Sequence, residues 1–144
     1  MTNELTVLEA LKTVIETEIQ QFLPEGSDFG VLIDFPDVDQ MPKKNMYYLQ
    51  PDYAEFSNMA VQSDLSEFKI SVFILCKRDT QENLTIKSYA FFKALYELLR
   101  TDISLDGTVD LTDIVDADFF PAVEGNPNVR GVEVHVSVRY TKDF

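Results

Sequence analysis

Apolar residues recur at helical spacing over residues 4–23. They lie three or four positions apart, while charged and amide residues such as Glu9 and Gln20 fall between them. The apolar positions are Leu8, Leu11, Ile15, Ile19 and Phe22. This spacing places them on one face of an amphipathic helix, which Pro24 and Gly26 then end.

A second helix is predicted from about residue 80 to residue 100. Asp79 and Glu82 have the spacing of a capping box, so Asp79 is the expected N-cap. The apolar positions of this segment are Leu84, Tyr89, Phe91, Phe92, Leu95, Tyr96, Leu98 and Leu99. Because they cover more than one narrow stripe, we expect a helix that lies across a sheet with a half-exposed aromatic rim. The alternative is a helix that also buries a second side against another subunit.

The clearest β-strand is residues 67–77, with the sequence EFKISVFILCK. Its even-numbered positions from Phe68 to Cys76 are apolar, and Phe73 and Leu75 make the opposite face apolar as well. A strand with two apolar faces is expected inside a sheet, with a strand on each side and both faces covered.

Shorter strands are predicted before this segment. Residues 29–35 and 45–50 read as two of them. The stretch between these two is polar and holds two prolines, so it is an expected exposed loop. Residues 51–64 have the least regular pattern, with one weak strand near residues 56–61. We therefore expect residues 36–64 to form a long and mobile loop region.

From residue 105 the pattern is again typical of strands, in the three segments LDGTVDLTDIV, DADFFPAV and RGVEVHVSVRY. A polar linker at residues 124–128 separates the last two segments. The predicted order is α-β-β-(β)-β-α-β-β-β, in one domain over residues 1–144. Because the strands come in runs, this order favours an α+β fold. A single mixed or mainly antiparallel sheet then carries both helices.

The last predicted strand holds the only histidine of the chain, His135. Val134 and Val136 belong to a row of alternating valines, and His135 lies in the polar row between them. Successive side chains of a strand point to opposite faces, so the valines pack together and the histidine faces the wetter side. We interpret His135 as a half-exposed strand residue without a catalytic role.

Composition limits the classes of function. The chain has 144 residues, of which 45% are hydrophobic, so it can build a core without disulfides. Its 12 Lys and Arg residues against 25 Asp and Glu residues give a net charge of −13, which disfavours nucleic-acid binding. The N-terminus lacks the basic region of a secretion signal, and no apolar run approaches the ~20 residues of a membrane helix. We expect a soluble, intracellular protein.

No motif of the sequence identifies a reaction. A nucleophilic site would have to pair Cys76 with His135, but Cys76 lies in the apolar row of its strand and reads as an inert core thiol. Six aspartates between residues 102 and 118 do not have the spacing of a calcium loop, and a strand would place them on different faces. The five glycines are not clustered into a phosphate-binding loop. We therefore expect neither an enzyme nor a bound metal or cofactor.

The order of elements over residues 67–140 carries a family resemblance. A strong strand runs directly into a helix in FKISVFILCKRDTQENLTIKSYAFFKALYELL. A strand, the aromatic and proline pair Phe120 and Pro121, a polar loop and a valine-rich last strand then follow. This order resembles phage tail terminator and tail-completion proteins. The resemblance implies a structural component of a phage or prophage virion.

Proteins of this family cap the tail tube as a ring, usually of six subunits, and offer a surface to the head connector. For this chain the resemblance implies assembly in the host cytoplasm, incorporation into the virion, and the tail tube and head connector as partners. The isolated protein is expected to be monomeric, because the acidic subunits repel one another until a tail end templates the ring.

Ring contacts are head-to-tail, so two different patches must meet. We predict one patch on the second helix, at Tyr89, Phe92 and Tyr96, because large exposed apolar surfaces usually mark contact sites. The second patch is expected in the loop region, at Asp37, Asp39, Lys43 and Lys44. The alternative function is a non-enzymatic α+β domain, monomeric or dimeric, that binds a small molecule or a protein. A ligand in a deep apolar pocket would favour that alternative.

Overall fold

The computed structural model describes residues 3–34, 44–60, 63–78, 83–120 and 128–143. The elements in these ranges are α1 (Glu4–Glu18), the 3-10 turn η1 (Ile19–Gln21), β1 (Gly30–Ile33), β2 (Met46–Ala60), β3 (Ser63–Lys77), α2 (Leu84–Thr101), β4 (Leu111–Phe120) and β5 (Val129–Asp143). Both predicted helices and the α+β class are confirmed. Of the helices in these ranges, none combines the length and the apolar character that crossing a membrane requires.

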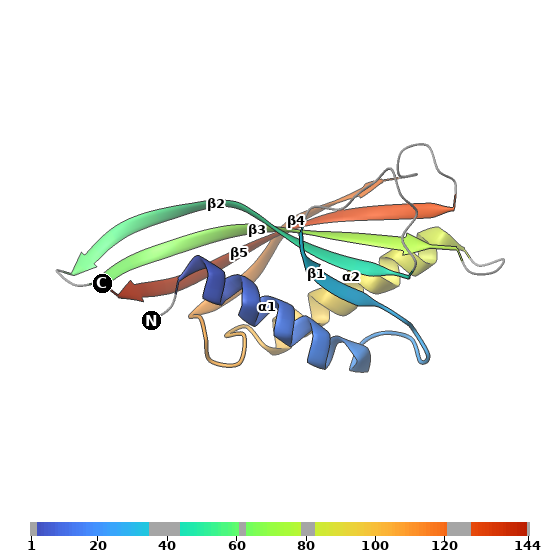
Figure 1. Ribbon diagram of the computed structural model, residues 1–144, viewed down its shortest axis with the longest axis horizontal. Coiled ribbons are helices and arrows are strands. Elements are labelled where there is room, and N and C mark those ends of the chain that lie inside the picture. Colours follow the sequence, from blue (N-terminus) through green and yellow to red (C-terminus); the bar gives the residue numbers. More distant parts are fainter. Residues whose placement is uncertain (1–2, 35–43, 61–62, 79–82, 121–127, 144) are drawn as a thin grey trace.

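The strands form one five-stranded sheet in the order β1-β2-β3-β5-β4 (Figure 1). β1 runs parallel to β2, and the other three pairs are antiparallel, so the predicted mixed sheet is confirmed. β3 lies between β2 and β5, as the two apolar faces of its sequence predict. Its pairing with β5 is unbroken from Ser63 opposite Asp143 to Lys77 opposite Val129.

Both helices pack on the same face of the sheet, which we call the helix face (Figure 1). Val7, Leu11 and Ile15 of α1 and Phe91 and Leu95 of α2 are buried there. The strand residues beneath them include Ile70, Val72 and Ile74 of β3 and Val132, Val134, Val136 and Val138 of β5. Removing one such side chain from water contributes about 2 kcal/mol to folding. The alternating valines of the last strand therefore form the floor of the core, as predicted.

The opposite side of the sheet, which we call the open face, differs from the prediction. No helix of the described ranges covers it, so the predicted cover of β3 is confirmed for the helix face only. On the open face Phe73 is half-buried, and Leu75 is buried between Met46 of β2 and Gly131 of β5.

Tyr47 ties α2 to the sheet through the core. Its ring is fully buried, stacks on Phe91 at a centroid distance of 5.9 Å, and meets Phe29 edge-on at 6.3 Å. Its hydroxyl donates a hydrogen bond to the carbonyl oxygen of Phe91 at 2.8 Å. Burial raises the pKa of Tyr47 well above its ordinary value, so the phenol stays protonated and acts as a donor.

The long hairpin of β2 and β3 corrects the predicted loop region. Residues 46–60 and 63–64 are strand, whereas residues 35–43 and 61–62 lie outside the described residues. The irregular pattern of residues 51–64 suggested a loop, but the observed strand passes through Pro51, which cannot donate to a sheet ladder. Within the described residues β1 pairs with β2 only as far as Leu49, and a bulge follows Pro51. Strand edges and bulges both tolerate proline. β2, β3 and β5 extend beyond the N-terminal end of α1, on the side of the molecule where the C-terminus lies (Figure 1).

The start of α2 also differs from the prediction. The N-cap is Asn83, whose Oδ1 accepts hydrogen bonds from the backbone N–H groups of Thr85 and Ile86 at 3.0 and 3.2 Å. The assignment of Asp79 as N-cap is therefore wrong, and Asp79 lies outside the described residues. Asparagine caps as well as aspartate does, and Asn83 directly precedes the first buried residue of the helix.

Residues 102–110 form turns instead of the predicted start of a strand. Leu105 and Asp106 have positive φ angles of 49° and 57°, and Asp102 accepts a hydrogen bond from the backbone N–H of Asp106 at 3.0 Å. β4 then covers the last five residues of LDGTVDLTDIV and the first five of DADFFPAV. Within the described residues, two final strands replace the three that the sequence predicts.

Candidate functional site

The outward side of α2 carries a cluster of aromatic rings. Tyr89 is 54% exposed and Tyr96 is 38% exposed, and Phe92 between them is half-buried. The ring of Phe92 lies 6.3 Å from that of Tyr89, 6.2 Å from that of Tyr96 and 5.4 Å from that of Phe119 on β4. We call Tyr89, Phe92, Tyr96 and Phe119 the aromatic patch. It joins the helix to an outer strand and leaves apolar ring surface in solvent.

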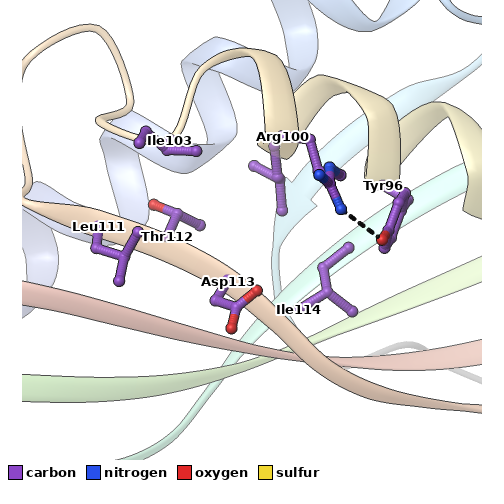
Figure 2. A pocket seen from close by; sticks show the side chains of 8 residues that line it. Tyr96, Arg100, Ile103, Leu111, Thr112, Asp113 and Ile114 are labelled. Carbon is purple, nitrogen blue, oxygen red and sulfur yellow. Dashed lines mark hydrogen bonds between the residues drawn. The ribbon is translucent and has the colours of Figure 1, made fainter.

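A groove of about 310 Å³ continues from the aromatic patch between α2 and β4 (Figure 2). Its apolar walls are formed by Leu99, Ile103 and Ile114. On the helix side Arg100 donates a hydrogen bond from Nη1 to the hydroxyl of Tyr96 at 3.0 Å, and its guanidinium carbon lies 5.6 Å from the centre of that ring. The groove therefore combines an apolar surface with a cation from α2 and the carboxylate of Asp113 from β4.

The structure brings together some of the predicted interface residues. Tyr89, Phe92 and Tyr96 form one exposed cluster, as their helical spacing predicts, while their role as an interface stays a prediction. Lys44 is exposed and lies before β2. Asp37, Asp39 and Lys43 lie outside the described residues.

Sequence reasoning did not assign Phe119 or Arg100 to this surface. Phe119 and Arg100 come to lie on this surface because α2 packs against β4. The turns of residues 102–110 separate these two elements along the chain. The only available signal was the apolar character of the segment around Phe119.

A bulge in β4 places three aspartates on the open face. Asp113 pairs with Ser137 and Asp118 with Glu133, and the register shifts between Ile114 and Asp116. Because the bulge adds one residue, Asp116 falls opposite His135 and shares the face of Asp113. The prediction that a strand would separate the aspartates onto different faces is therefore wrong for these three, since it assumed an uninterrupted alternation.

His135 lies on the open face between two carboxylates. Its Nδ1 makes a hydrogen bond with Asp116, and its Nε2 lies 2.8 Å from Oε2 of Glu133. The hydrogen bond to Asp116 raises the pKa of His135 above its ordinary value of 6.5; burial opposes this shift, and Glu133 adds to it. The side chain is 30% exposed, so the predicted half-exposed histidine is confirmed. Its two partners were not predicted.

A second polar cluster lies on the same face. Glu67 accepts hydrogen bonds from the ammonium of Lys69 and from the hydroxyl of Ser137, both at 3.0 Å. These two hydrogen bonds lower the pKa of Glu67, the contact with Lys69 contributing most. The cluster links β3 to β5 by side chains as well as by the backbone ladder.

Cys76 and His135, the two residues considered for a nucleophilic site, do not lie together. Cys76 is fully buried on the helix face, whereas His135 lies on the open face, so the sheet separates the thiol from the imidazole. In the part of the chain that the structure describes, no three His, Cys, Asp or Glu side chains are grouped to hold a metal ion.

No protein-family model and no curated protein sequence matches this chain. Among solved structures, it is similar to the sheath/tube terminator of an extracellular contractile injection system in the extended state. The TM-score is 0.59 at 11% identity, and the match covers 100% of this chain but only 58% of that one. A chain of a native gene transfer agent virion matches 94% of this chain and 95% of its own, at a TM-score of 0.49 and 7% identity. The terminator structure confirms, at the level of the fold, the resemblance that the sequence predicts.

Proposed function

We propose that this protein is a structural component of a phage tail or a related tube assembly, in which it terminates the tube. The observation that carries the proposal is the similarity of the whole chain to a sheath/tube terminator. The sequence pattern of residues 67–140 points to the same family independently. In this role the protein is assembled in the host cytoplasm, becomes part of the particle, and has no catalytic step.

The proposed assembly is a ring of subunits, six by analogy with tail terminators, between the tail tube and the head connector. The aromatic patch supports a contact role, because exposed rings on a soluble subunit are typical of surfaces that become covered. Asp37, Asp39, Lys43 and Lys44 remain the proposed second contact region.

The experiment adds purified protein to tail tubes assembled without a terminator and counts capped tubes by electron microscopy. Tyr89→Asp places a charge in the aromatic patch, and we expect it to weaken capping by about tenfold or more. The matched control is Ile86→Asp, which changes a more exposed residue of the same helix, 67% exposed, outside the patch. Circular dichroism and thermal unfolding verify that both variants are folded.

Two results would contradict the proposal at different levels. Failure of the unaltered protein to cap any tube argues against the terminator function. Equal capping by Tyr89→Asp and the unaltered protein leaves that function intact and excludes the aromatic patch as the contact.

A further inference from the structure

The sheet of this protein ends in two different strands. β1 lies at one end and β4 at the other, and within the described residues neither has a second strand beside it. An outer strand presents backbone N–H and C=O groups that can pair with another chain. Two unlike edges on one subunit provide the two patches that a head-to-tail contact needs.

The β4 edge is apolar and acidic. Val115, the extra residue of the bulge, is 52% exposed, and Phe120 at the end of the strand is 41% exposed. Asp113 and Asp118 stand on the open face of the same strand, and both are exposed. Two β4 edges brought together would place these aspartates near one another, so like charges disfavour a symmetric β4–β4 contact.

The β1 edge combines apolar side chains with charges of both signs, since exposed Asp28 and Asp34 flank the strand and Lys44 lies beside it. Leu32 is 47% exposed and pairs with Tyr48, which places it on the open face. Lys44 is exposed, and its alkyl chain packs closely against Gly30. A Cβ atom added to Gly30 would lie only 2.9 Å from Cε of Lys44. A groove of about 460 Å³ beside β1 is lined by Phe29, Leu32, Lys44 and the acidic Glu16 among others. Lys44 is thus a cation at this edge that can face an aspartate of β4.

We infer that copies of this protein join edge to edge, the β1 edge of one subunit meeting the β4 edge of the next on a common open face. Leu32 then packs with Val115 or Phe120, and Lys44 faces Asp113 and Asp118. The contact is heterologous, so repeated addition closes into a ring when the rotation permits. This inference rests on the proposed ring and, in place of the two patches predicted from the sequence, assigns the contact between subunits to the two sheet edges.

The test is disulfide trapping between subunits. Leu32→Cys is combined in one chain with Asp113→Cys, Val115→Cys or Asp118→Cys, and the concentrated protein is oxidised and separated on a denaturing gel. The native Cys76 is fully buried and does not interfere. We expect at least one pair to give a ladder that extends beyond the dimer, because each subunit then bridges two neighbours. Trapping captures short-lived contacts, so a stable ring of isolated protein is not required.

The controls separate this contact from others. Leu32→Cys with Ile86→Cys places the second thiol on α2 and should give no ladder. Lys44→Glu should reduce the ladder, and Asp113→Lys with Asp118→Lys in the same chain should restore it. No ladder from any β1–β4 pair, or as much cross-linking from Val115→Cys alone as from the pairs, would overturn the inference. Because trapping needs no tail, a ladder from protein that fails to cap tubes would refute the proposed function and leave the edge contact standing.

Discussion

Val134 and His135 are adjacent in the sequence and lie on opposite faces of the sheet. Val134 is fully buried among the valines of the core, whereas His135 is 30% exposed beside Asp116 and Glu133. A single step along the strand therefore exchanges an apolar environment for a polar one.

A charge at position 134 is expected to be severe. Val134→Asp buries a carboxylate without a partner and should lower the free energy of unfolding by more than about 3 kcal/mol. His135→Gln should lower it by no more than about 1 kcal/mol, because solvent screens an ion pair at a partly exposed site. Urea denaturation of both variants measures the difference. Equal losses would show that the assignment of faces is wrong.

The single histidine also gives one unambiguous titration signal. We expect nuclear magnetic resonance to report a pKa for His135 above 6.5, and Asp116→Asn to lower it, because that hydrogen bond is the main cause of the shift. A raised folded-state pKa stabilises the protein fully below the unfolded value of about 6.5. This contribution is lost as the pH rises through the folded-state pKa. A pKa at or below 6.5 would contradict the carboxylate contacts.

At the scale of elements, local signals located the helices better than the ends of the strands. The side chain of Asn83 caps α2 by accepting hydrogen bonds from the backbone N–H groups two and three residues later, which is a local effect. β2, in contrast, continues through Pro51 because β3 lies beside it along its whole length and β1 has already ended. The bulge in β4 likewise depends on its pairing with β5.

The N-cap of α2 can be tested directly. Asn83→Ala removes the acceptor for two backbone N–H groups and should lower the free energy of unfolding by about 1 kcal/mol. Asn83→Asp keeps an acceptor at the same place and should change it by only a few tenths of a kcal/mol. Chemical denaturation of the two variants side by side provides the comparison. An alanine variant as stable as the native protein would argue against the cap.

At the scale of the whole molecule, the net charge of −13 opposes contact between copies. In the proposed ring, one lysine facing two aspartates offsets only part of that repulsion, so we expect a tail end to supply the remaining free energy. In the proposed assembly, the aromatic patch and the two sheet edges are the surfaces that we expect to be covered, and they are exposed in the isolated subunit.

Changing the salt concentration should show whether repulsion between whole subunits or attraction between close charge pairs dominates the association. When the ionic strength rises from about 0.01 M to about 0.1 M, the Debye length falls from about 30 Å to about 10 Å. We expect the sedimentation coefficient of concentrated protein to increase over this range, because screening reduces repulsion between whole subunits more than it weakens a close pair. A decrease in association with salt would mean that attractive charge pairs dominate the contact.

Periodicity alone was sufficient to predict both helices, the central place of β3 and the buried row of valines, because each depends on which side chains share a face of a single element. Only the tertiary structure joined Phe119 to the rings of α2, brought Asp116 to His135, and extended β2 past Pro51. Those features depend on the register between strands that are far apart along the chain, and on a bulge that shifts it by one residue. A single sequence contains the alternation of each strand but not the partner that each strand chooses.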